Sequence, residues 1–185
     1  MDTRLHNALK DLHSFSCLSN LAYQTTRKLS PEIYNEMVIS ILYRLTYLSF
    51  ESEPLQEAIR TGLLVFSSTI FIQRNFFEQP YDHLLSLLSN SLIKMRESSD
   101  VDVPVPIVLW LTMLSHIVAE KEPYQEDWRG VWLDETLLRT GIDSWSQARD
   151  MLKSIVWVDF IHERLGKQAF EAAMLRLNNA AGVDI

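Results

Sequence analysis

Cysteine, glycine and proline are all scarce in this chain. Only one of its 185 residues is a cysteine, Cys17, which excludes an internal disulfide and a zinc site built from cysteines. There are 5 glycines and 6 prolines, whereas sheet-rich domains need many tight turns made with these residues. This scarcity favours long helices joined by few connections. The single cysteine and the mixed, charged N-terminus also favour a reducing, intracellular location.

Positive charge is also in short supply. The formal net charge is −7, and no run of four or more basic residues occurs. Nucleic acid binding needs surfaces rich in lysine and arginine to neutralise phosphates, so we expect no direct contact with nucleic acid. No apolar stretch reaches the ~20 residues that cross a bilayer. The sequence also has no glycine-rich phosphate loop and no nucleophile elbow, so we expect neither catalysis nor a cofactor.

Residues 104–119, PVPIVLWLTMLSHIVA, form the segment around which we expect the chain to fold. From residue 107 to residue 119 only Thr112, Ser115 and His116 interrupt the apolar run. A helix that is apolar on every side belongs inside a core. Pro104 and Pro106 suit an extended lead-in and a first helical turn. We therefore predict an all-α fold, with one domain over residues 1–185 and about seven to eight helices around a central buried helix at about 104–119.

The other helices are predicted from apolar residues that recur at spacings of three and four. They cover residues 3–28, 31–50, 54–74, 82–96 and 128–140. Ser30 and Pro31 form a helix start signal. Gly62 lies inside a predicted helix, which indicates close contact with a neighbouring helix. Gly141 is placed to end the helix 128–140 in a left-handed cap.

The last two helices are predicted from capping residues and glycine. Ser144 and Gln147 fit a capping box. The helix that they open is expected to continue through Ile161, and Gly166 is expected to separate it from a final helix over residues 167–178.

Three segments near the C-terminus follow one another in an order typical of one family. They are PIVLWLTMLSHIVA, a tryptophan-bearing helix that ends at Gly141, and SWSQARDMLKSIVWVDFIHERLGKQAFEAAM. The third contains W-x-x-A-x-x-x-L, then a W-V-D core, then histidine and glycine; these positions are Trp145, Ala148, Leu152, Trp157, Asp159, His162 and Gly166. Over residues 104–175 this order resembles the C-terminal part of the fungal-specific transcription factor domain, the regulatory region of fungal zinc-cluster activators.

The resemblance implies a non-catalytic regulatory, effector or protein-interaction domain that works in the nucleus. The family's six-cysteine DNA-binding cluster does not occur in this sequence, so we expect a fragment or a form without that module. The partners implied are other proteins of the transcription machinery, a second copy of the chain through self-association, or a small hydrophobic effector. Two alternatives stay open: a small helical carrier or enzyme with a hydrophobic pocket, and a helical adaptor.

Asp159 is the charge whose surroundings matter most. On a continuous helix it would share an apolar face with Leu152 and Ile155, and a buried carboxylate needs a partner. The preferred interpretation is a structural buried charge, bonded to a helix end or paired with Arg164 or Arg139. The alternative is a switch or a ligand contact. Asp159 and His162 have the spacing of metal ligands, but no second pair of this kind occurs, so no metal is expected.

Tryptophans provide the remaining candidate site. All five lie in the last 76 residues, and core packing accounts for most of them. A pocket for an apolar effector or a partner could still be lined by Trp110, His116, Trp132 and Trp157. For His116 the simpler interpretation is a neutral histidine bonded to a backbone carbonyl. Cys17 is expected to be a buried, inert thiol, and His6 and His13 are expected at the surface.

Overall fold

The computed structural model describes residues 1–25, 30–75, 82–98, 103–119 and 128–182. These residues form eight α-helices and no strand, so the predicted all-α fold is confirmed. The helices are α1 (Thr3–Thr25), α2 (Pro31–Thr46), α3 (Pro54–Asn75), α4 (Asp82–Glu97), α5 (Val105–Val118), α6 (Trp128–Thr140), α7 (Trp145–Ile155) and α8 (Asp159–Ala181).

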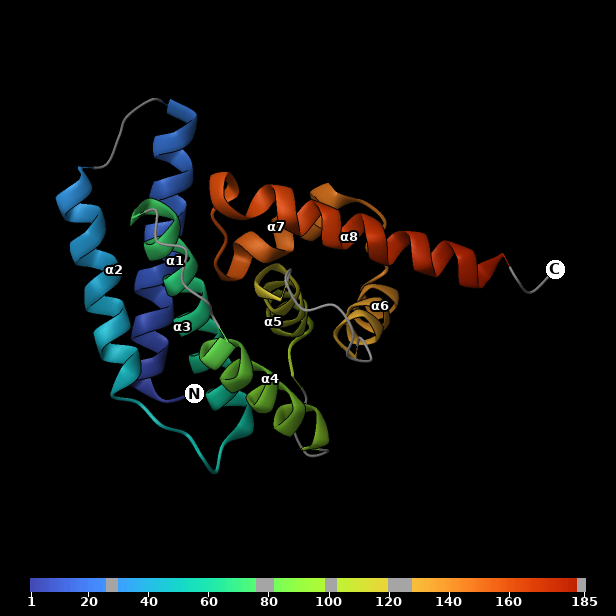
Figure 1. The fold of residues 1–185 in the computed structure, drawn as a ribbon, viewed down its shortest axis with the longest axis horizontal. Helices are drawn as coiled ribbons and strands as arrows, with labels where there is room; N and C mark the ends of the chain where they lie inside the picture. Colours follow the sequence, from blue (N-terminus) through green and yellow to red (C-terminus); the bar gives the residue numbers. More distant parts are fainter. Residues whose placement is uncertain (26–29, 76–81, 99–102, 120–127, 183–185) are drawn as a thin grey trace.

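Helix α5 lies at the centre of the molecule, as predicted. It is seen end-on in Figure 1, with α3 and α4 on one side and α6, α7 and α8 on the other. Most of its side chains are buried, including Leu109, Trp110 and Leu114. Apolar residues from all eight helices belong to one continuous core cluster. Helix α5 has 14 residues and no lysine, arginine, aspartate or glutamate, so the other helices can enclose most of it.

Several local signals act as the sequence predicted. The Ser30 hydroxyl accepts a hydrogen bond from the backbone N–H of Ile33, and Pro31 occupies the first turn of α2. Gly141 has a φ of 64° and ends α6 in the left-handed conformation. Gly62 is packed against α5: a Cβ added there would lie 2.6 Å from Leu111 Cδ2 and 2.9 Å from the Trp110 ring. The absence of a side chain at Gly62 lets α3 and α5 approach closely.

The main correction concerns the boundary between α7 and α8. The predicted helix through Ile161 ends at Ile155, and residues 156–158 are not helical. Val156 is extended, with φ −152° and ψ 127°. Val156, Trp157 and Val158 are all fully buried, and in an extended segment successive side chains point to opposite sides. This short linker can therefore send side chains into the core in more than one direction, which one helix face cannot do.

The predicted role of Gly166 is also wrong. It does not separate helices but lies inside α8. A Cβ at this position would lie 2.7 Å from Trp157 Cζ2 and 2.9 Å from Trp145 Cη2. Glycine is required here because two indole rings lie directly against the backbone of α8.

Smaller differences occur at the N-terminal half. Helix α2 ends at Thr46 and not at Phe50. The predicted end of the first helix, at residues 26–28, lies outside the described residues. Cys17 is exposed and not buried. Among the described helices, none is long and apolar enough to span a membrane.

Candidate functional site

Aromatic rings from three parts of the chain meet beside α5. Trp110 of α5 lies 6.4 Å from Phe66 of α3, measured between ring centroids. Phe66 stacks on His162 of α8 at 4.7 Å, and His162 lies 5.1 Å from Trp157. We call Trp110, Phe66, His162 and Trp157 the aromatic column. It brings together two of the four residues predicted to line a pocket.

The column is closed to solvent. Trp110 is 1% exposed and Trp157 and His162 are 0% exposed. Trp157 also packs edge-on against Trp145, at 6.2 Å between centroids. The rings of the column therefore pack against one another in the core. The Nε1 groups of both Trp110 and Trp157 are buried without an acceptor among the described residues.

His162 is the titratable group of the column. Its Nε2 lies 2.9 Å from Thr69 Oγ1 and its Nδ1 lies 3.1 Å from the carbonyl oxygen of Val158, so both ring nitrogens have partners. Burial lowers the pKa of His162 to about 3, although the hydrogen bond to Val158 acts in the opposite direction. The ring is therefore neutral at physiological pH and serves to join α3, the linker and α8.

Helix α1 holds the linker from the other side. Asn20 Nδ2 donates to the carbonyl oxygen of Trp157 at 2.8 Å, and Asn20 Oδ1 accepts from the backbone N–H of Asp159 at 2.8 Å. His13 Nδ1 lies 2.7 Å from the carbonyl oxygen of Ile155. His13 is half-buried rather than a surface residue. The spacing of seven between His13 and Asn20, two helical turns, places both on one face of α1.

Asp159 forms an ion pair, but its partner differs from the predicted ones. It is the first residue of α8, and its Oδ2 accepts from Lys153 Nζ at 2.7 Å. Neither Arg164 nor Arg139 pairs with it. The side chains of Asp159 and Lys153 are 18% and 29% exposed, so the carboxylate is partly and not fully buried. The partner changed because the chain turns after Ile155, which brings the end of α7 to the start of α8.

The other two predicted pocket residues lie elsewhere. Trp132 of α6 packs against Trp128 at 6.1 Å, and the Arg96 guanidinium lies over its ring at 5.4 Å. His116 is half-buried in the last turn of α5. The predicted pocket of Trp110, His116, Trp132 and Trp157 therefore divides between the aromatic column and other parts of the core, and its role in binding stays a prediction.

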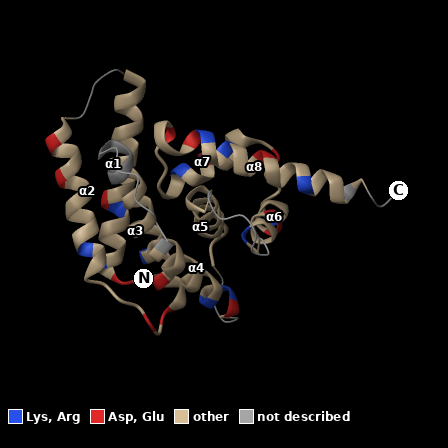
Figure 2. Ribbon diagram, in the orientation of Figure 1, with Lys and Arg blue, Asp and Glu red and all other residues tan. Residues whose placement is uncertain are grey.

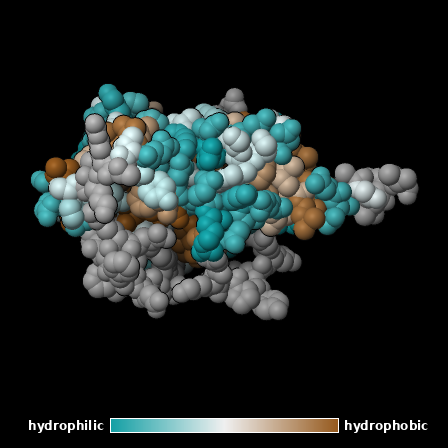
Figure 3. All heavy atoms as spheres, turned by 90° about the horizontal axis from the view of Figure 1, so that it is seen from above, coloured by the Kyte–Doolittle hydropathy of each residue, from teal (hydrophilic) through white to brown (hydrophobic). Residues whose placement is uncertain are grey.

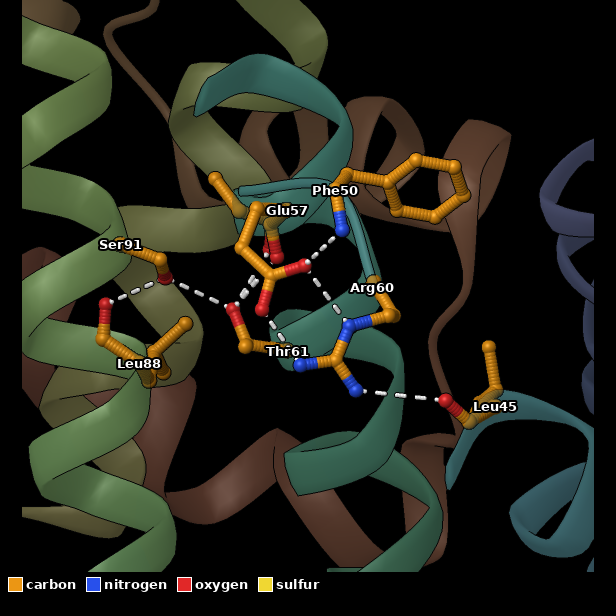
Figure 4. A network of polar contacts seen from close by, with 8 residues as sticks. Leu45, Phe50, Glu57, Arg60, Thr61, Leu88 and Ser91 are labelled. Atoms are coloured by element: carbon orange, nitrogen blue, oxygen red, sulfur yellow. Dashed lines mark hydrogen bonds and ion pairs between the residues drawn. The ribbon is translucent and has the colours of Figure 1, made fainter. Parts of the chain in front are cut away.

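A polar cluster that the sequence did not predict lies at the start of α3 (Figure 4). Glu57 Oε2 accepts hydrogen bonds from Arg60 Nε at 2.9 Å and from the backbone N–H of Phe50 at 3.1 Å. Arg60 Nη1 donates to the carbonyl oxygen of Leu45 at 3.2 Å. Burial alone would raise the pKa of Glu57, but the hydrogen bond and charge of Arg60 outweigh it and lower the pKa. Thr61 bonds to Ser91 of α4 at 2.7 Å. The contacts of Glu57 and Arg60 hold the connection between α2 and α3, and the Thr61–Ser91 contact joins α3 to α4.

The remaining charged groups of the described part of the chain are spread over its helices (Figure 2). No group of three or more histidine, cysteine, aspartate or glutamate side chains that could hold a metal occurs there. Lysines and arginines are interspersed with aspartates and glutamates over the helices (Figure 2), and α5 carries neither. Hydroxyl groups inside α5, those of Thr112 and Ser115, donate to carbonyl oxygens of their own helix.

Comparisons of this chain with models of protein families, with curated proteins and with solved structures gave no match. The described residues themselves form an all-α array of helices with a buried aromatic core.

Proposed function

We propose that this chain is a non-catalytic regulatory module that acts by binding other proteins, like the regulatory region of fungal zinc-cluster transcription factors. One observation carries the proposal. The three segments on which the resemblance rests, α5, α6 and the pair α7–α8, contact one another around α5. Segments that pack as one unit can move and respond as one unit, which is what a regulatory module needs.

The charge distribution supports protein partners over nucleic acid. The net charge of −7 repels phosphate backbones, and acidic and basic residues are interspersed on the described helices in Figure 2. Large apolar side chains remain on outer faces, such as Leu138 of α6 and Leu175 of α8, which are 69% and 62% exposed. Protein interfaces combine apolar and polar surface, so such side chains are available to a partner. A nuclear location forms part of this proposal.

Tethering tests the proposal directly. The whole chain is fused to an unrelated sequence-specific DNA-binding domain in yeast, and a reporter gene with matching sites is measured. We expect the fusion to change reporter output several-fold relative to the DNA-binding domain alone, in either direction.

The matched control is the fusion that carries Gly166→Val, whose side chain cannot fit against Trp157. It should express but lose the effect, because the module would no longer pack. A wild-type fusion with the same output as the DNA-binding domain alone, on both activated and repressible reporters, would contradict the regulatory role.

A further inference from the structure

Helix α2 has a second apolar face that points away from the core. Its inner face buries Tyr34, Val38, Ile41 and Leu45. On its outer side four large residues are 51% to 72% exposed, namely Ile33, Ile39, Tyr43 and Tyr47. In Figure 1, α2 forms the outer edge of the molecule, and Figure 3 shows hydrophobic atoms at that end. A helix that is apolar on two opposite sides has one side available for a partner.

The tyrosines of this face are already ordered. The rings of Tyr43 and Tyr47 lie 4.7 Å apart, and the Tyr43 hydroxyl donates to that of Tyr47 at 3.0 Å. A hollow of about 340 Å³ also lies between α1 and α2, with Asp11 and Ser14 on one side and Met37 and Ser40 on the other. The face therefore offers both projecting rings and a place to receive one.

Residues on this face are arranged symmetrically about Ser40. Glu36 and Arg44 lie four residues before and after it, Met37 and Tyr43 lie three before and after it, and Ile33 and Tyr47 lie seven before and after it. Spacings of three, four and seven keep these residues on neighbouring positions of one helix face. The charges on the two sides of Ser40 are opposite, and the side chain at the centre is small.

We propose that this face binds a second copy of the chain, with the two α2 helices antiparallel and crossing at Ser40. In that register Glu36 of each copy faces Arg44 of the other, and Tyr43 of each copy stands opposite Met37, which lines the hollow. A two-fold axis requires such a self-complementary patch. Arg44 already contacts Asp11 at 2.7 Å, but both side chains are exposed, and exposed pairs contribute too little to prevent an exchange of partners.

The dimer is expected to be weak. One 16-residue helix is about 24 Å long, and a single pair of helices buries less surface than the ~1,200–2,000 Å² of stable complexes. Association should therefore be visible at high micromolar concentration. This inference is independent of the regulatory role, because a mass measurement involves no transcription readout.

Charge exchange tests the register. Sedimentation equilibrium of the whole chain is measured from about 10 to 500 µM, a range chosen for a small interface. We expect a reversible monomer–dimer equilibrium for the wild type. Glu36→Arg alone and Arg44→Glu alone should each weaken it by about tenfold or more, because like charges then face each other. An equimolar mixture of the two variants should dimerise again, because every facing pair is then of opposite charge.

The control variant is Glu171→Arg. Glu171 is an exposed residue of α8, distant in sequence from the α2 face, so this variant should dimerise as the wild type does. Circular dichroism of each variant verifies folding, and recovery in the mixture shows that neither variant is misfolded. The proposal is overturned if the wild type stays monomeric throughout the range. It is also overturned if neither charge reversal weakens the dimer, or if the mixture of the two variants does not dimerise.

Discussion

Asn20 and Trp157, which are 137 positions apart, are joined by a hydrogen bond of 2.8 Å from the Asn20 carboxamide to the Trp157 carbonyl oxygen. The same carboxamide accepts a hydrogen bond from the backbone N–H of Asp159 at 2.8 Å. One side chain of α1 thus satisfies a carbonyl of the linker and an orphan N–H at the start of α8. Helix ends need such partners, because their first N–H groups have none within the helix.

Replacing Asn20 with alanine removes both hydrogen bonds. We expect a loss of about 1–3 kcal/mol in the free energy of unfolding, because two backbone groups of a buried segment lose their partner. Urea unfolding followed by circular dichroism measures it. The control is Asn179→Ala on the exposed end of α8, which should leave the midpoint unchanged. Equal midpoints for Asn20→Ala and the wild type would show that α1 does not hold the linker.

Gly166 is expected to resist even the smallest side chain. Gly166→Ala gains about 1 kcal/mol of helix propensity, but its Cβ would lie 2.7 Å from Trp157 Cζ2, and overpacking typically costs about 1–3 kcal/mol. We expect net destabilisation and a changed tryptophan fluorescence spectrum. Gly182→Ala is the matched control, because its Cβ would meet nothing closer than 3.5 Å. A stabilised Gly166→Ala protein with an unchanged spectrum would contradict the close packing of α8 on the two indole rings.

Acid should destabilise the fold through His162. Its folded pKa, lowered to about 3 by burial, is below the unfolded value of about 6.5, so the unfolded chain binds the proton more tightly between these values. The contribution of His162 to the free energy of unfolding is then fully present above pH 6.5. It falls by roughly 1 kcal/mol per pH unit as the pH drops towards 3. Unfolding by urea at pH 7, 6 and 5 measures the slope.

The neutral variant His162→Gln separates this contribution from others. It should be less stable than the wild type at pH 7, because it loses the ring stacking on Phe66, but its stability should change less between pH 7 and pH 5. The same slope in both proteins would mean that another group is responsible for the acid sensitivity.

The Lys153–Asp159 pair should stabilise the turn between α7 and α8. With both side chains less than a third exposed, a double-mutant cycle with Lys153→Met and Asp159→Asn is expected to give a coupling energy of about 1 kcal/mol. The longer and more exposed Lys167–Glu171 pair, at 3.7 Å, provides the comparison and should give a smaller coupling. A coupling of zero for Lys153 and Asp159 would mean that this pair does not stabilise the turn.

The sequence predicted what depends on local pattern. Helix α5 was recognisable because its composition alone, apolar on every side, determines where it lies. Ser30 and Gly141 act through contacts with their own chain neighbours, so their roles were also predictable. Gly62 was interpreted correctly because a glycine inside a strongly apolar helix lowers helix propensity, and close packing against a neighbouring helix is what offsets that cost.

The end of α7 was not predictable in this way. The non-helical residues 156–158 are bonded to Asn20 and flanked by the His13 contact at Ile155, and both partners are more than 130 positions away. A helical glycine and a terminal glycine look alike in sequence, and only the positions of Trp145 and Trp157 show that Gly166 lies inside a helix. The partner of Asp159 depends on the same turn, so the sequence does not predict it.

Hydrogen exchange of the backbone amides measures whether the other helices enclose α5. We expect amides between Leu109 and Ile117 to exchange most slowly of all, and only as fast as global unfolding measured by urea allows. Amides at the exposed end of α8, around Asn178, should exchange far sooner. Rapid exchange of the α5 amides under native conditions, at rates similar to those around Asn178, would contradict the enclosure of α5.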